Sequence, residues 1–165
     1  MPHPDTLKMT VPLEVGIGCS NLATMRHFYE QVLGLQFISE ARVPPQTAQR
    51  YRLASGSATV VRLQTPYGER IKLIAPDAPV ALPASHPVHV FDQPNAMYLT
   101  FIIRDIQAVT TRVLAQGGQA MSGPEPIESR PGLFVAFLRD PEGNVVELVQ
   151  YDDVAAYRPD LQGKA

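Results

Sequence analysis

Hydrophobic positions along the chain change from a strand-like to a helix-like spacing and back again. In residues 13–19 apolar side chains take every second position, with Glu14 between them, which predicts a short strand. From residue 22 to residue 33 they recur every three or four positions and Gly34 follows, which predicts an amphipathic helix capped by Ser20 or Asn21. Three further stretches have strand character: residues 35–39, 58–64 and 70–74.

The second half of the chain repeats this order. Residues 98–103 read as a strand, Asp105 as a helix cap, and Gly117-Gly118 as the end of the helix. Three more strand-like stretches follow, at residues 119–122, 134–139 and 145–150. The pattern predicts an α+β fold made of two β-α-β-β-β repeat units, which form a curved mixed sheet around a cleft.

The repeat also holds in register. A shift of 84 residues carries Glu14 onto Tyr98, and a shift of 75 carries Lys72 onto Glu147. The nine-residue difference between the shifts falls between the helix and the third strand, where loops absorb changes of length. These four polar positions lie on otherwise apolar strands, and charged residues are rarely buried without a partner or a task. If the units curve toward each other, we expect the four side chains to converge in one cleft.

The prolines and the periodic segments together suggest boundaries. Sixteen prolines cluster in connections and leave the periodic segments almost free of them. We expect a flexible N-terminus at 1–10, a first unit at 11–76, a Pro-rich connection at 77–96, a second unit at 97–151 and a C-terminal tail at 152–165.

Composition excludes several classes of function. The 165 residues are 45% hydrophobic and 18% charged, with a net charge of −2, so nucleic acid and membrane surfaces are not expected partners. Cys19 is the single cysteine, which excludes an internal disulfide and a Cys-rich metal site. Residues 1–10 do not look like a signal peptide and no apolar run reaches the length of a membrane span, so a cytoplasmic protein is expected.

Several motifs resemble the vicinal oxygen chelate superfamily, which includes glyoxalase I, methylmalonyl-CoA epimerase, extradiol dioxygenases, and fosfomycin- and bleomycin-resistance proteins. The resemblance covers residues 11–151. It rests on Ser20-Asn21-Leu22, His27-Phe28-Tyr29, Val32-Leu33-Gly34-Leu35 and, most specifically, Arg139-Asp140-Pro141-Glu142-Gly143-Asn144-Val145-Val146-Glu147-Leu148. It implies a glyoxalase-like fold, a small-molecule substrate or ligand, and a homodimer.

The resemblance also implies where a metal would be held. In metal-dependent members, ligands lie on the first and last strands of each unit, and those positions fall here on Glu14, Lys72, Tyr98 and Glu147. Only the two carboxylates are ordinary ligands of hard divalent ions, and a protonated Lys72 would repel a metal. We therefore expect no cofactor. A divalent metal, if one is bound, would use Glu14 and Glu147, with Tyr98 or a loop histidine as further ligands.

The same four residues have both chemical and structural interpretations. Glu14 or Glu147 can serve as a base, and each can equally be half of an ion pair with Lys72. Lys72 can stabilise an oxyanion, act as a base or nucleophile if burial lowers its pKa, or simply neutralise a former metal site. Tyr98 can donate its phenol to a substrate oxygen or lie in the core with its hydroxyl satisfied.

Residues in the connecting segments are candidates for substrate binding. By resemblance, residues 39–57 and 123–132 would line the cleft, and their arginines could hold a carboxylate or phosphate or could be solvated. The Pro-rich connection either joins the units or folds over the cleft as a lid carrying a histidine. The candidates are Arg42, Arg50, Arg52, Arg130, His86 and His89.

Together these features predict a metal-independent isomerase, epimerase or lyase that transfers a proton next to a carbonyl. One alternative is a binding protein of the bleomycin-resistance type, which needs an apolar cleft and no catalytic group. The other is a metal-dependent lyase or dioxygenase with an atypical ligand set, although a facial triad of two histidines and one carboxylate is absent from these positions.

Overall fold

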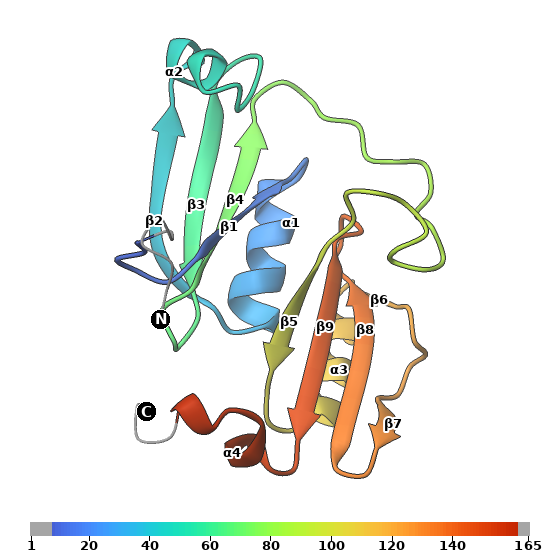
Figure 1. Ribbon diagram of the computed structural model, residues 1–165. Helices are drawn as coiled ribbons and strands as arrows, with labels where there is room; N and C mark the ends of the chain where they lie inside the picture. Colours follow the sequence, from blue (N-terminus) through green and yellow to red (C-terminus); the bar gives the residue numbers. More distant parts are fainter. Residues whose placement is uncertain (1–7, 162–165) are drawn as a thin grey trace. The chain divides into compact units, whose positions relative to one another are not determined.

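The chain divides into two compact units, residues 1–81 and 82–165, each built around one mixed sheet with a helix on one face (Figure 1). The structure is a computed structural model and describes residues 8–161. The boundary falls inside the Pro-rich connection, so residues 77–81 belong with the first unit and residues 82–96 with the second.

The first unit contains a four-stranded sheet in the order β1-β4-β3-β2, in which β1 runs parallel to β4 and the other pairs are antiparallel. Asn21 caps the helix that follows β1, because its side chain accepts a hydrogen bond from the Thr24 amide. The elements are β1 (Glu14–Gly18), α1 (Leu22–His27), the π-helical segment η1 (Phe28–Val32), β2 (Gln36–Val43), α2 (Pro45–Arg50), β3 (Ala58–Gln64) and β4 (Arg70–Pro76).

The core of the first unit lies between α1–η1 and one face of this sheet. Alternate residues of the strands point to it, which is why the sequence reads apolar at every second position. Its most buried side chains are Met25, Phe28, Tyr29, Val61, Leu63 and Leu73. The opposite face carries the polar residues, and we call it the open face.

The second unit has the same construction. Its sheet has the order β5-β9-β8-β6, with β7 also paired to β8, and the core between the sheet and α3 includes Val113, Leu138, Val146 and Leu148. The elements are β5 (Tyr98–Ile102), α3 (Ile106–Ala115), β6 (Gln119–Ala120), β7 (Ile127–Arg130), β8 (Leu133–Arg139), β9 (Val145–Tyr151), α4 (Val154–Tyr157) and a 3₁₀ turn η2 (Pro159–Leu161).

The predicted repeat is confirmed at the level of strand register. The bounds of β1 shifted by 84 are those of β5, and the bounds of β4 shifted by 75 are those of β9. Glu14 pairs with Arg70 in the first unit, and Tyr98 pairs with Val145 in the second, so both parallel pairs have the same register. The α+β class with two β-α-β-β-β units is therefore correct, with one mixed sheet in each unit.

Four short elements were not predicted. The helix α2 buries only Ala48, and β7 is exposed throughout, so neither has a periodic apolar pattern that sequence can reveal. The other two, α4 and η2, lie in the segment expected to be a tail. The expected flexible N-terminus falls mainly on residues 1–7, which lie outside the described residues, as do residues 162–165.

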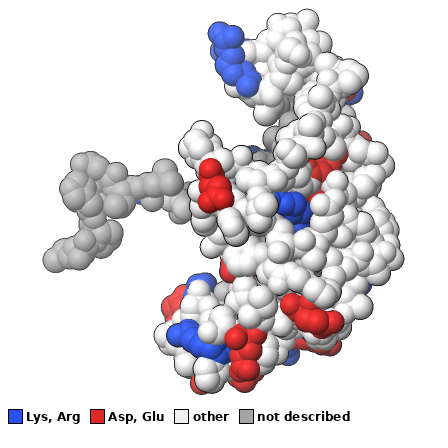
Figure 2. All heavy atoms as spheres, turned by 90° about the vertical axis from the view of Figure 1, so that its right-hand side faces the viewer, with Lys and Arg blue, Asp and Glu red and all other residues white. Residues whose placement is uncertain are grey.

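The surface has few charged groups on the face shown in Figure 2, as the low charged content of the sequence predicts. Uncharged side chains cover most of this face. Cys19 is buried, as a small apolar residue would be. Within residues 8–161, no helix is long and apolar enough to cross a membrane.

Candidate functional site

The open face of the first unit carries a carboxylate held between two cations. Glu14 pairs with Arg70, and Lys72 lies one alternation further along β4, so all three side chains point to the same side. The Lys72 ammonium is 3.4 Å from Glu14 Oε2, and Arg70 Nη1 is 3.6 Å from Glu14 Oε1. Arg70 Nε also donates to Gln64 Oε1 at 2.8 Å. These side chains are about two-thirds buried, so the charges are partly shielded from solvent.

The open face of the second unit carries a carboxylate in a different setting. Glu147 pairs with Thr100 across β9 and β5, and the Thr100 hydroxyl donates to Glu147 Oε2 at 2.5 Å. Tyr98 lies two residues before Thr100 and therefore on the same face. Its ring meets that of Phe137 edge to face, with centroids 5.3 Å apart, and Phe137 is the β8 partner of Glu147. The Tyr98 ring therefore reaches across β9 toward the level of Glu147.

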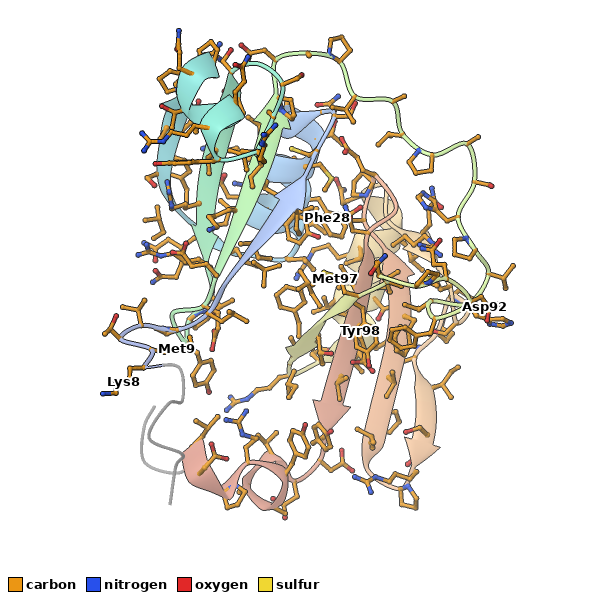
Figure 3. The ribbon with its side chains drawn as sticks, turned by 45° about the horizontal axis from the view of Figure 1, so that its top comes forward. Lys8, Met9, Phe28, Asp92, Met97 and Tyr98 are labelled. Carbon is orange, nitrogen blue, oxygen red and sulfur yellow. The ribbon has the colours of Figure 1, made fainter. Side chains whose placement is uncertain are left out.

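A pocket of about 440 Å³ opens beside Tyr98. Figure 3 shows Tyr98 on β5 and Asp92 on the Pro-rich connection, residues 77–96, which we call the connecting segment. This segment forms another wall of the pocket. Most of its lining residues are apolar or aromatic, with a few that carry polar groups, as is usual in small-molecule sites. The lining residues are Val88, His89, Val90, Phe91, Asp92, Tyr98, Met121, Ser122 and Phe137.

The connecting segment is fastened to the turn between β8 and β9. Arg139 is buried, and its guanidinium donates to the Pro87 carbonyl at 2.7 Å and to the Gly143 carbonyl at 2.8 Å. The His86 ring lies so close to Gly143 that a Cβ there would be 2.0 Å from His86 Nε2. These contacts position the segment that includes His89, which lines the pocket, whereas His86 packs on the turn.

The most specific sequence motif has a structural task at this turn. Asp140 is completely buried, and its Oδ1 accepts hydrogen bonds from the amides of Glu142 and Asn144. Its Oδ2 accepts a third bond from the Asn144 side chain. Gly143 has a φ of 92°, a conformation that favours glycine. The motif therefore shapes the turn that holds the connecting segment.

The arginines proposed from the sequence lie in varied settings. Arg42 forms a two-pronged ion pair with Asp77 and also donates to Ser57, so its guanidinium is already occupied. The hydrogen bond from Arg42 lowers the pKa of Asp77 and raises the pKa of Arg42 itself. The other three, Arg50, Arg52 and Arg130, are exposed.

The second unit also contains a tyrosine pair that the sequence did not indicate. Tyr151 and Tyr157 stack with ring centroids 4.0 Å apart. Burial raises the pKa of Tyr151, and a hydrogen bond with Tyr157 raises it further, while Arg130 lowers it and Glu147 raises it. Tyr151 lies on the same face of β9 as Glu147, four residues away, so strand alternation alone would have drawn attention to it.

A comparison with models of known protein families identifies the superfamily of this chain. Residues 12–148 match the model of the Glyoxalase/Bleomycin resistance protein/Dioxygenase superfamily. The chain belongs to this superfamily. A search of curated proteins found no match.

Solved structures of glyoxalase family proteins have the same fold. A glyoxalase family protein from Bacillus cereus has a TM-score of 0.73 at 20% identity, covering 89% of this chain and 97% of its own. The trypanothione-dependent glyoxalase I of Leishmania major has a TM-score of 0.63 at 18% identity, covering 93% and 97%. A glyoxalase family protein from Enterococcus faecalis has a TM-score of 0.58 at 18% identity, covering 86% and 97%.

The four positions that the superfamily resemblance singled out form two pairs. The structure brings Glu14 and Lys72 into contact in the first unit, and it places Tyr98 and Glu147 on one face of the second. The convergence of all four in one cleft stays a prediction. Arg70 and Thr100 were not among the residues predicted from the sequence, although they lie two residues from Lys72 and Tyr98 and share their faces by strand alternation.

Proposed function

We propose that this superfamily member is an enzyme that moves a proton next to the carbonyl of a small organic substrate, as an isomerase, epimerase or lyase does. Glu147 is the base and the Tyr98 phenol binds the carbonyl oxygen. The observation that carries the proposal is the setting of Glu147. Within residues 8–161 its carboxylate accepts a hydroxyl hydrogen bond from Thr100 and is held in no salt bridge, so it is available to take a proton.

Glu14 is the less suitable base of the two. Its carboxylate is the counter-ion that Lys72 and Arg70 share, and taking a proton would leave both of those cations without it. Protonation of Glu147 breaks no ion pair, and the Thr100 hydroxyl can rotate to accommodate it.

The chemistry needs two contributions from this face, a base and a hydrogen-bond donor. The Glu147 carboxylate takes the proton from the carbon next to the carbonyl, and the C–H electron pair moves toward the carbonyl oxygen. Tyr98 then donates its O–H to the developing oxyanion, an interaction worth roughly 10²–10³ in rate when the donor is pre-positioned. Return of the proton to the same or the neighbouring carbon gives an epimerase or isomerase, and loss of a leaving group from the next carbon gives a lyase.

The pocket beside Tyr98 supports this assignment. Apolar and aromatic residues line the pocket beside Tyr98, and a hydrogen bond to a substrate that fills it would be partly shielded from water. Phe137 holds the Tyr98 ring in an edge-to-face contact and so limits its movement. A small carbonyl compound would fit the volume available.

The proposed reaction uses no metal. In the first unit an ammonium and a guanidinium lie 3.4 and 3.6 Å from the Glu14 carboxylate, so a divalent ion would have to displace two cations. A protonated lysine offers no lone pair to a metal. Within the described part of either unit, no three His, Cys, Asp or Glu side chains gather as a ligand set. The donor chemistry does not fit a resident divalent metal, and no step is assigned to one.

A non-catalytic binding protein is the second candidate. The aromatic pocket favours it, because an apolar cavity is sufficient to hold a ligand without chemistry. Such a protein would retain its ligand unchanged, and binding would not depend on Glu147.

Proton exchange at carbon tests the proposal before the substrate is known. A panel of small aldehydes, ketones, 2-oxoacids and thioesters is incubated with the protein in D₂O, and loss of the C–H signal next to the carbonyl is followed by NMR. We expect exchange with at least one class, reduced by roughly 10²–10⁴ in Glu147→Gln, the range of general-base catalysis. Tyr98→Phe should lower the exchange rate by roughly 10²–10³, the contribution of one oxyanion donor.

The control is Glu69→Gln, which removes the same charge from an exposed carboxylate in the first unit that also accepts from a threonine hydroxyl, that of Thr65. It should exchange at the wild-type rate, and circular dichroism should show all variants folded. Exchange that is unchanged in Glu147→Gln would refute the proposal. Ligand-observed NMR signals of binding, with no exchange in any protein, would favour the binding protein instead.

A further inference from the structure

The open face of the first unit has more positive than negative charge. Arg62 on β3 is the direct partner of Lys72 on β4, and Gln64 is the partner of Arg70 in the next row. Residues opposite each other in an antiparallel pair point to the same side, so Arg62 shares the face of Lys72 and Arg70. Across β1 to β4 this face has three cations and a single carboxylate, that of Glu14.

Two of these cations lie beside each other without a shared acid. Directly opposite residues have Cβ atoms about 5 Å apart, where like charges destabilise a sheet. Glu14 contacts Lys72 and Arg70, but within residues 8–161 no salt bridge to Arg62 is formed. Arg62 is half-buried, so solvent only partly screens its charge. This arrangement is unfavourable unless an anion joins it.

We propose that this face binds the oxyanion group of a small organic molecule, a carboxylate or a phosphate, between Arg62, Arg70 and Lys72. Arginine presents a planar fork that matches such groups, and lysine adds a compact charge. The Gln64 amide oxygen already orients the Arg70 guanidinium from one side. Glu14 is the internal counter-ion, and it competes with the incoming anion for Lys72 and Arg70.

This inference goes beyond proton transfer and stands without it. It concerns a binding site in the first unit, and its test involves no turnover. The ligand class follows from the residues: the group must carry at least one negative charge and two oxygens that accept from different donors.

The test is a titration of the ¹⁵N-labelled full-length protein with sodium phosphate or sodium malonate, with sodium chloride keeping the ionic strength constant. Arginine side-chain and backbone amide signals are followed by NMR. We expect saturable shifts at the signals of Arg62, Arg70 and Lys72. The probe that binds more tightly identifies the preferred group, phosphate or carboxylate.

Two variants should weaken anion binding and a third should tighten it. Arg62→Gln should weaken binding by at least about tenfold, since it removes a charge-assisted hydrogen bond, and Lys72→Gln should weaken it as well. Glu14→Gln should tighten binding several-fold, because it removes the competing carboxylate. Arg104→Gln is the charge-matched control, since Arg104 is exposed and lies in the other unit. It should bind like the wild type.

Shifts that do not saturate with either probe would overturn the inference. Equal weakening in Arg62→Gln and Arg104→Gln would also overturn it, because net charge alone would then explain the effect. So would an unchanged or weaker affinity in folded Glu14→Gln. If the protein binds neither probe but shows Glu147-dependent proton exchange, this inference alone is overturned. If it binds a probe but shows no Glu147-dependent exchange, the proposed function alone is overturned.

Discussion

Gly143 offers a direct test of how the connecting segment is held to the second unit. Its φ of 92° is a left-handed conformation, and a Cβ added there would lie 2.0 Å from His86 Nε2. Alanine at this position therefore has two separate costs. One is backbone strain, and the other is expulsion of the imidazole from the turn.

The two costs can be estimated separately. A left-handed conformation costs an L-residue about 1–2 kcal/mol. If expelling His86 also pulls the Pro87 carbonyl away from Arg139, a hydrogen bond to a charged group is lost, worth about 1.5–3 kcal/mol. We therefore expect Gly143→Ala to lower the free energy of unfolding by about 2.5–5 kcal/mol, and by about 1–2 kcal/mol when His86 is already alanine.

The assay is a double-mutant cycle by chemical denaturation, with wild type, Gly143→Ala, His86→Ala and the double variant. Gly34→Ala is the matched control, because Gly34 also has a positive φ, of 82°, but open space where its Cβ would be. It should show the backbone cost alone. An equal cost of Gly143→Ala in both His86 backgrounds would refute the contact between the segment and the turn.

Three further predictions follow from the ionisable groups. Elemental analysis after incubation with Zn, Ni, Mn and Fe(II) should find less than stoichiometric metal in wild type and more in Lys72→Gln, and stoichiometric metal in wild type would contradict the proposed metal-free mechanism. Because its pKa is lowered by Arg42, Asp77 stabilises the fold above its ordinary pKa of about 4 and loses this effect as pH falls through the lowered value. The stability difference between wild type and Asp77→Asn, measured by thermal unfolding, should therefore shrink in acid, and a constant difference would be inconsistent with the ion pair. In Tyr157→Phe the pKa of Tyr151 should fall but stay raised, since burial is its main cause; NMR titration of ¹³Cζ-labelled tyrosine measures this, and an unmoved pKa would exclude the hydrogen bond.

The sequence predicted best what depends on local pattern. Alternation located β3 at its observed bounds, and capping chemistry identified Asp105 and limited the first cap to Ser20 or Asn21. The side chains of Asn21 and Asp105 each accept from an amide three residues later. The repeat offset identified Lys72 and Glu147 as equivalent positions before any strand was paired.

Contacts that depend on strand pairing or on the course of a loop could not be predicted. The proximity of Arg62 to Lys72 follows from the register of β3 against β4, which a single sequence does not specify. The packing of His86 on Gly143 depends on the course of a Pro-rich segment that has no periodicity. Exposed β7 has no apolar face by which alternation could reveal it.

Because the two units have the same strand register, equivalent residues on their open faces can differ in charge while the core on the opposite face keeps its packing. Lys72 and Glu147 occupy the same place in their sheets, yet one is a cation and the other an anion, and both point away from the helix that completes the core. A change of charge at either place leaves the packing of Leu73 or Leu148, on the other side of the strand, untouched. Such positions can acquire new chemistry by single substitutions, so a duplicated scaffold of this kind can diversify its reactions without first having to gain stability.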